Sequence, residues 1–180
     1  MTKPRFASVW LGGCSGCHMS FLDMDEWLFD LAELVDVVYS PIIDVKAFPE
    51  NVDITLVEGA VANEDNVEVA RVVRANSRVV ASFGDCAVST NVTGMRNPLG
   101  DPRRILERVY LDSPDRDPVV PEAEGIVPAL LEKVLPLHKV IPVDFYMPGC
   151  PPSAAEIRRA LETLLSDDLR HGIPEDIRRG

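Results

Sequence analysis

Four cysteines offer the clearest chemistry in this sequence. Cys14 and Cys17 form a C-x2-C pair, whereas Cys86 and Cys150 stand singly much further along the chain. Structural zinc usually takes two close pairs of ligands, and this chain has one such pair. A redox-active C-x-x-C pair would leave Cys86 and Cys150 without a chemical role. In another interpretation, these two cysteines are simply small buried hydrophobic residues. A [4Fe–4S] cluster accepts four thiolates from separate loops, so the spacing favours an iron–sulfur site.

The residues around the cysteines support this interpretation. Glycine lets the backbone bend tightly and approach a bulky anionic cofactor, because it has no side chain and tolerates positive φ. Glycines stand close to all four cysteines, at Gly12, Gly13, Gly16, Gly84 and Gly149. Pro151 and Pro152 follow the last cysteine, similar to the Cys-Pro step at ferredoxin clusters. The local sequence therefore agrees with a cluster site.

Short apolar runs predict the strands that must position these cysteines. The expected strands cover residues 5–11, 37–45, 52–61, 78–83 and 140–146, and Pro41 makes the second an edge strand or two fragments. An apolar stripe from Met24 to Val35, the segment 64–75 and the segment after a Ser153–Glu156 capping box predict helices. This alternation implies an α/β fold with a mostly parallel sheet flanked by helices. All four cysteines then follow strands, where such folds collect ligands.

Residues 90–127 interrupt the alternation. The segment holds five prolines and three glycines among many Asp and Arg residues, and one short helix is expected at 104–111. Long irregular segments are usually functional or part of an interface. We expect a long irregular excursion here, within a single domain of residues 1–180.

The charge and the N-terminal sequence exclude several classes of function. The chain has 18 Lys and Arg against 29 Asp and Glu, a net charge of −11, which disfavours binding to nucleic acid or to an anionic membrane. No apolar run approaches the roughly 20 residues of a membrane span, and residues 6–11 are too short for a secretory signal. Arg103-Arg104 lies too deep for a twin-arginine signal. We therefore expect a cytoplasmic protein with reduced thiols.

Four short motifs, taken in order, resemble a known family. They are GCSGC at 13–17, VEG at 57–59, GDC at 84–86 and PGCPP at 148–152. Together they resemble the small subunit of [NiFe]-hydrogenases and the related cluster-bearing subunit of NADH:quinone oxidoreductase, over about residues 5–165. The resemblance implies a flavodoxin-like fold.

Two departures from the wider family narrow the resemblance. The quinone oxidoreductase subunits carry adjacent cysteines at the first motif, whereas this chain has the hydrogenase form Cys14-Ser15-Gly16-Cys17. No cysteine follows Cys150, so the chain could ligate only the proximal cluster of the hydrogenases. The resemblance is therefore to the small (delta) subunit of cytoplasmic, bidirectional NAD(P)-reducing hydrogenases. It implies electron transfer between a [NiFe] large subunit and diaphorase subunits that carry iron–sulfur clusters, a flavin and the NAD(P) site.

Carried over residue by residue, the resemblance makes Cys14, Cys17, Cys86 and Cys150 the ligands of one [4Fe–4S] cluster. Glu58 matches the acidic residue of the Glu-Gly motif, which implies a place near the cluster and a role in proton transfer. The alternative for Glu58 is a carboxylate that caps a helix or stabilises a loop.

Other groups leave alternatives open. His18 could donate a hydrogen bond to the cluster or pack at a subunit interface. Some relatives of this type are thought to hold FMN, but residues 12–17 offer only the Ser15 hydroxyl to a phosphate. The chain shows neither a pair of C-x-x-C motifs for a Ni–Fe centre nor a dinucleotide fingerprint, which would place both functions in partner chains. The alternative functions are a subunit that passes electrons toward quinone and a zinc-stapled interaction domain.

Overall fold

The computed structural model describes residues 2–112 and 118–166. Its centre is a five-stranded sheet in the order β2-β1-β3-β5-β7, in which every neighbouring pair is parallel. If only the five strands of this sheet are numbered in chain order, their spatial order is 2-1-3-4-5. This is the flavodoxin-like order and confirms the expected fold class. The strands are β1 (Arg5–Trp10), β2 (Asp36–Tyr39), β3 (Val52–Glu58), β5 (Ser77–Phe83) and β7 (Phe145–Met147).

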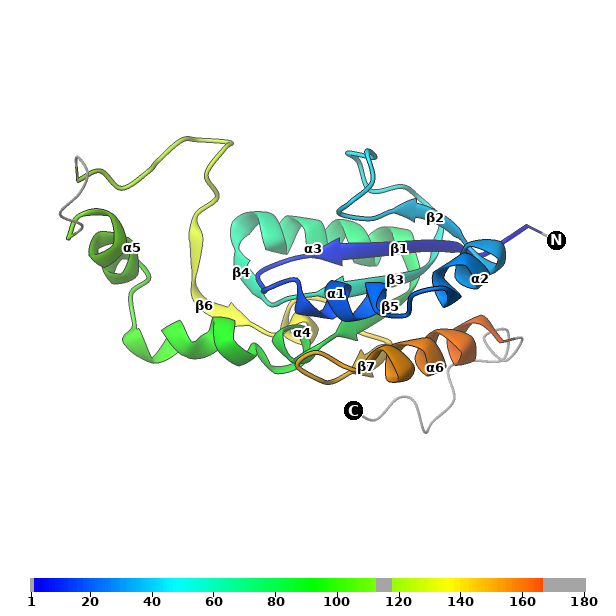
Figure 1. Cartoon of the computed structure of the whole chain (residues 1–180). Coiled ribbons are helices and arrows are strands. Elements are labelled where there is room, and N and C mark those ends of the chain that lie inside the picture. The colour runs from blue at the N-terminus through cyan, green and yellow to red at the C-terminus, as the bar shows by residue number, and fades with distance from the viewer. Residues whose placement is uncertain (1, 113–117, 167–180) are drawn as a thin grey trace.

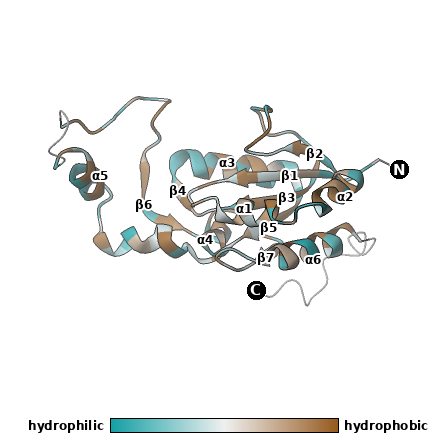
Figure 2. Ribbon diagram, in the orientation of Figure 1, coloured by the Kyte–Doolittle hydropathy of each residue, from teal (hydrophilic) through white to brown (hydrophobic). Residues whose placement is uncertain are grey.

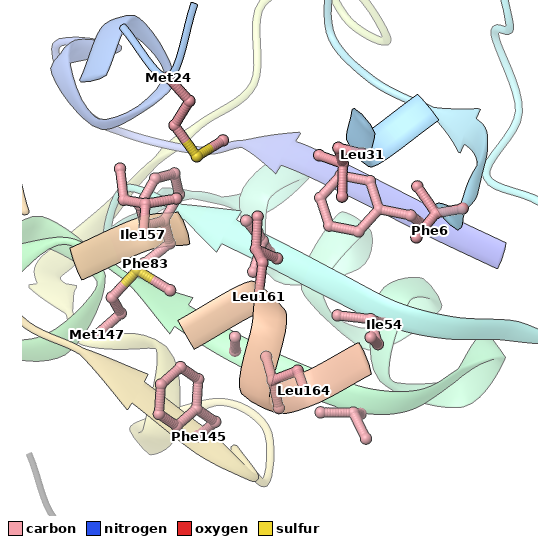
Figure 3. Packing of buried hydrophobic residues seen from close by; sticks show 14 of the residues in the cluster. Phe6, Met24, Leu31, Ile54, Phe83, Phe145, Met147, Ile157, Leu161 and Leu164 are labelled. Atoms are coloured by element: carbon pink, nitrogen blue, oxygen red, sulfur yellow. The ribbon is translucent and has the colours of Figure 1, made fainter. Parts of the chain in front are cut away.

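Helices cover both faces of this sheet (Figure 1). On one face, Ile157, Leu161 and Leu164 of α6 pack toward strand residues such as Ile54 and Phe83 (Figure 3). On the other face, α3 packs its Ala70 and Val73 into a second cluster with β3 and β5. The central strands are apolar on both sides because helices cover both. The helices on the first face are α1 (Gly16–Leu22), α2 (Trp27–Leu34) and α6 (Ala154–Leu165), and α3 is Glu64–Asn76.

Most predicted elements are present near their expected bounds, and the capping box is formed. The Ser153 hydroxyl accepts from the Glu156 backbone N–H, and the Glu156 carboxylate accepts from the Ser153 N–H at 2.9 Å. The helix predicted from the stripe between Met24 and Val35 begins later than expected, because a turn with Asp25 at φ 50° separates α1 from α2.

One prediction about the strands was wrong, and one pair of strands was missed. The strand expected at 140–146 is limited to Phe145–Met147, because residues 137–139 form the 3-10 helix η2 and Pro142 has no N–H to donate. A two-stranded antiparallel ribbon of β4 (Val61–Asn63) and β6 (Leu130–Leu135) was not predicted.

The expected excursion forms an arm, defined here as residues 91–112 and 118–129, which extends away from the sheet (Figure 1). It contains the 3-10 helix η1 (Asn91–Leu99) and α5 (Arg103–Tyr110), neither of which has a fully buried residue, and α5 confirms the short helix expected at 104–111. The loop before β6 also carries hydrophobic residues (Figure 2), and Ile126 in this loop is 80% exposed. Residues 113–117 of the expected excursion lie outside the described residues.

Two side chains fix the base of the arm. The Arg96 guanidinium donates to the backbone oxygens of Ala62 and Leu131 at 3.0 and 2.8 Å, and burial lowers its pKa. The Asn97 amide exchanges two hydrogen bonds with the backbone of Val134, at 2.9 and 2.8 Å. The start of the arm is therefore attached to the β4–β6 ribbon. None of the described helices has the length and apolar character needed to cross a membrane.

Candidate metal centre

The four cysteines come from three loops at the carboxyl edge of the sheet. Cys14 and Cys17 follow β1, Cys86 follows β5 in the short helix α4 (Asp85–Ser89), and Cys150 follows β7. All four are free thiols, and Cys17 and Cys86 are buried whereas Cys14 and Cys150 are exposed. The sheet thus brings together all four cysteines predicted from the sequence, because parallel strands end on one side.

The thiols are close enough to affect one another's ionisation. Burial is the main cause that raises the pKa of the Cys17 thiol to about 12, and the next causes are the negative charges of Glu58 and of the other three cysteines. The pKa of Cys86 is raised in the same way, by burial and then by Cys14 and Cys150. With raised pKa values, Cys17 and Cys86 need bound cations before they become thiolates at neutral pH.

Glycines lie against two of the cysteine sulfurs. Among the residues that the structure describes, no three His, Cys, Asp or Glu side chains lie close enough together to hold a single metal ion. A Cβ atom at Gly16 would lie 3.3 Å from the Cys14 sulfur, and one at Gly84 would lie 2.1 Å from the Cys17 sulfur. Four soft sulfur donors in a cradle that glycine keeps open fit an iron–sulfur cluster.

Asp85 joins the loop of Cys86 to the loop of Cys150. Its carboxylate accepts from the Gly149 N–H at 2.7 Å, and its own N–H donates to the Gly149 oxygen at 2.9 Å. Sequence reasoning assigned no role to Asp85, although its place within the Gly-Asp-Cys motif was a usable signal. This reciprocal pair of hydrogen bonds fixes the two loops relative to each other.

Two more side chains reach the Cys150 loop, and sequence reasoning identified neither. The Ser20 hydroxyl donates to the Pro152 oxygen at 2.6 Å and ties α1 to the residues after Cys150. The Asn91 amide donates to the Cys150 sulfur at 3.2 Å. No sequence pattern links these partners, because each pair is far apart along the chain.

Glu58 ends β3, between the loops of Cys17 and Cys86, and is 3% exposed. Its carboxylate accepts from the backbone N–H groups of Cys17 and His18, at 3.2 and 3.0 Å, and pairs with Nδ1 of the His18 ring. The residue before α1, Ser15, has φ 65° and offers no side-chain cap. A carboxylate from a distant strand therefore caps the first turn of α1, which is the stabilising role that the sequence left open beside proton transfer.

His18 is buried beside this carboxylate. Its ring lies edge-on to Trp10 and Phe83, with centroids 5.3 and 5.8 Å apart, and its Nε2 atom has no hydrogen-bond partner in the structure. The ring is thus fixed by Glu58 on one side and by two aromatic rings on the others.

Known proteins have similar sequences and a similar fold. The family model described as "NADH ubiquinone oxidoreductase, 20 Kd subunit" matches residues 14–164. The NAD-reducing hydrogenase HoxS subunit delta of Cupriavidus necator is 38% identical over 181 residues, covering 97% of this chain and 82% of that protein. The F420-non-reducing hydrogenase of Methanothermobacter thermautotrophicus has a subunit that is 37% identical over 171 residues, covering 92% of this chain.

Solved structures of hydrogenases also resemble this chain. A chain of an NAD+-reducing [NiFe]-hydrogenase in the H2-reduced state has a TM-score of 0.86 and 42% identity, with 91% of both chains covered. A [NiFeSe]-hydrogenase from Dm. baculatum, at 17% identity and a TM-score of 0.59, shares the fold. The chain spans about half the length of the first curated relatives, 54% and 53%. With the family model matched over residues 14–164, the chain belongs to the family of the 20 kDa subunit of NADH:ubiquinone oxidoreductase.

Proposed function

We propose that this chain is the electron-transfer small subunit of a soluble, bidirectional [NiFe]-hydrogenase that catalyses H2 + NAD(P)+ ⇌ H+ + NAD(P)H in the cytoplasm. One [4Fe–4S] cluster, held by Cys14, Cys17, Cys86 and Cys150, relays electrons between the Ni–Fe site of a large subunit and diaphorase subunits. The observation that carries the proposal is the convergence of four free cysteines from three loops, in a chain 42% identical to one of an NAD+-reducing [NiFe]-hydrogenase.

The residues around the sulfurs give this chain its part in the reaction. The cluster, when bound, accepts and passes on single electrons. Asp85 fixes the loops of Cys86 and Cys150 relative to each other, and Glu58 fixes the first turn of α1, where Cys17 lies. Hydrogen bonds of this kind, beyond the ligands themselves, orient the ligands of a metal centre. Glu58 is also our candidate for moving protons near the cluster.

The partner chains are expected on the exposed side of the site. Cys14 and Cys150 are exposed, and α1 and η1, which follow the cysteine loops, expose apolar side chains such as Met19 at 57% and Met95 at 73%. Exposed apolar groups of this extent mark interaction surfaces. We propose that the large subunit covers the faces built by residues 12–18 and 84–95.

Iron analysis of the complex tests this function. We expect about four irons and four acid-labile sulfides per chain in anaerobically purified complex. Cys86→Ser and Cys150→Ser should lose or degrade the cluster, whereas Ser89→Ala, at the exposed end of α4, should retain it. Full iron retention in both cysteine variants overturns the ligand assignment, and zinc in place of iron supports the zinc-stapled alternative. Fluorescence of an acid extract tests separately for FMN on this chain.

The second candidate is a subunit that passes electrons toward quinone, which the match to the NADH ubiquinone oxidoreductase family favours. Nickel analysis and a hydrogen-dependent dye assay separate the two functions. A nickel-containing complex that reduces the dye with H2 supports the hydrogenase. A nickel-free complex that reduces quinone with NADH supports the alternative.

A further inference from the structure

The Asn91 side chain donates a hydrogen bond to one of the four cysteine sulfurs. Its Nδ2 atom lies 3.2 Å from Sγ of Cys150, which is 59 positions away along the chain. A thiolate has no proton to donate, so it can pair with the NH2 end of this amide and not with its oxygen. Asn91 therefore reaches from the segment after the Cys86 helix to the sulfur that the loop after β7 provides.

The backbone that aims Asn91 is strained. Thr90 has φ 76° and Asn91 has φ 41°. A positive φ is unusual for any residue with a side chain and is a clear outlier for a β-branched one such as Thr90. Strained positions of this kind cluster at functional sites, where neighbouring contacts hold them in place.

Two hydrogen bonds hold the Thr90–Asn91 corner in this conformation, and a glycine leaves room for it. The Thr90 N–H donates to the Cys86 oxygen at 3.0 Å, and the Thr93 hydroxyl donates to the Thr90 oxygen at 2.5 Å. A Cβ atom at Gly94 would lie 2.1 Å from the Thr90 hydroxyl, so the glycine leaves space for that side chain. The contacts link the corner directly to Cys86, and the amide links it to Cys150.

We propose that the Thr90–Asn91 corner raises the reduction potential of the cluster by directing the Asn91 amide onto the Cys150 sulfur. A hydrogen bond to a ligand sulfur stabilises the reduced, more negative cluster more than the oxidised one. Asn91 is thus a positioning and tuning residue that acts through Cys150. The inference rests on the proposed function, because it requires a redox-active cluster on these cysteines.

The test is an EPR-monitored redox titration of the full chain in its anaerobically purified complex. The relevant signal is the one that Cys150→Ser removes. Asn91→Gly removes the donor and tolerates the positive φ, and Asn91→Asp keeps the shape but replaces the donor with a negative oxygen. The matched controls are Asn97→Gly and Asn97→Asp, because Asn97 lies in the same η1 helix and bonds to the backbone of Val134 instead of a sulfur.

Both Asn91 variants should keep their iron and titrate at a lower potential. We expect the ratio of reduced to oxidised cluster, measured at the wild-type midpoint, to fall by about threefold or more in Asn91→Gly, which corresponds to ~28 mV at 59 mV per tenfold change for one electron. The fall should be larger in Asn91→Asp, and the Asn97 variants should stay at the wild-type value.

The outcomes separate this inference from the proposed function. An unchanged potential with full iron in both Asn91 variants overturns the inference alone. Loss of iron from both Asn91 variants also overturns it, because the amide would then hold the loop together instead of tuning the cluster. The Asn97 variants shifting as far as the Asn91 variants would overturn it too. A wild-type chain without iron contradicts the proposed function before Asn91 is tested.

Discussion

Gly84 lies so close to Cys17 that a Cβ atom on residue 84 would stand 2.1 Å from the Cys17 sulfur. Gly84 follows β5 and has φ 81°, whereas Cys17 lies in α1 after β1. The backbone of one ligand loop therefore packs directly on the sulfur supplied by another. Residue 84 must be glycine for two independent reasons, its conformation and the space taken by that sulfur.

Gly84→Ala should remove the cluster although it changes no ligand. The new methyl group must displace the Cys17 sulfur or the loop before Cys86, so we expect the iron content to fall by more than about half. Gly100→Ala is the matched control, because Gly100 has φ 80° and a methyl group there would meet no atom within 4 Å. Iron analysis and EPR of both variants test this. Equal iron in the two variants would contradict the prediction, because the contact with the Cys17 sulfur would then have no effect beyond that of the positive φ that both glycines share.

Glu58→Gln separates proton transfer from helix capping. The amide keeps the shape of the carboxylate but only one accepting oxygen, so it retains one of the two hydrogen bonds from the N–H groups of Cys17 and His18, and it cannot carry a proton. If Glu58 moves protons, H2-dependent dye reduction should fall by about a hundredfold while dithionite still reduces the cluster. Dye reduction at the wild-type rate would make Glu58 structural and place the proton path wholly in the partner. Loss of the cluster would show that capping is its essential role.

The cluster-free chain should become less stable in alkaline solution. Its Cys17 thiol has a pKa raised by burial from 9.0 to about 12. Below pH 9 both folded and unfolded states keep the proton, so stability is full there. Between these two values the unfolded thiol ionises first, and the free energy of unfolding should fall by up to about 1.4 kcal/mol per pH unit.

Urea denaturation of the cluster-free chain from about pH 8 to about pH 10.5 measures this fall. Cys17→Ser is the control, because serine does not ionise in this range, and its free energy of unfolding should fall less steeply. A slope that is the same in both chains would mean that other groups cause the alkaline loss of stability.

Met95→Asp should weaken binding of the large subunit. Met95 is 73% exposed in η1, on the face that we propose the large subunit covers. Burying an unpaired carboxylate there should reduce co-purification by about tenfold or more. Phe29→Asp is the control, because Phe29 is 77% exposed on α2, outside the proposed interface. Equal recovery of the large subunit with both variants would contradict the proposed interface.

The sequence was informative wherever local pattern decides structure. The apolar runs that became β1, β3 and β5 are buried by helices on both faces, so their hydrophobicity is continuous and easy to recognise. The Ser153–Glu156 box involves residues three apart and depends on no distant contact. The cysteines could be placed after strands for the same reason, because they and their neighbouring glycines lie shortly after the apolar runs in the sequence.

The missed features depend on contacts between distant residues. Asp85 pairs with Gly149, and Asn91 with Cys150, and no local period records such pairs. β6 (Leu130–Leu135) is half exposed and becomes a strand by pairing with the three residues of β4. Around Pro142 the apolar composition resembles a strand, but a hydrogen bond from the Ile141 N–H to the Leu137 oxygen turns the chain there. Tertiary structure overrides propensity at β6, whereas the turn before Pro142 is local.

The short strand β7 sets the order in which the site can be completed during protein synthesis. Among the described strands it pairs with β5 alone, where Ala81, Ser82 and Phe83 lie opposite Phe145, Tyr146 and Met147. Cys150 follows this strand and is the last of the four cysteines to leave the ribosome. For the proposed four-cysteine cluster, a donor that acts on the growing chain would meet three thiols and an open sheet edge, so cluster insertion would have to follow the docking of β7.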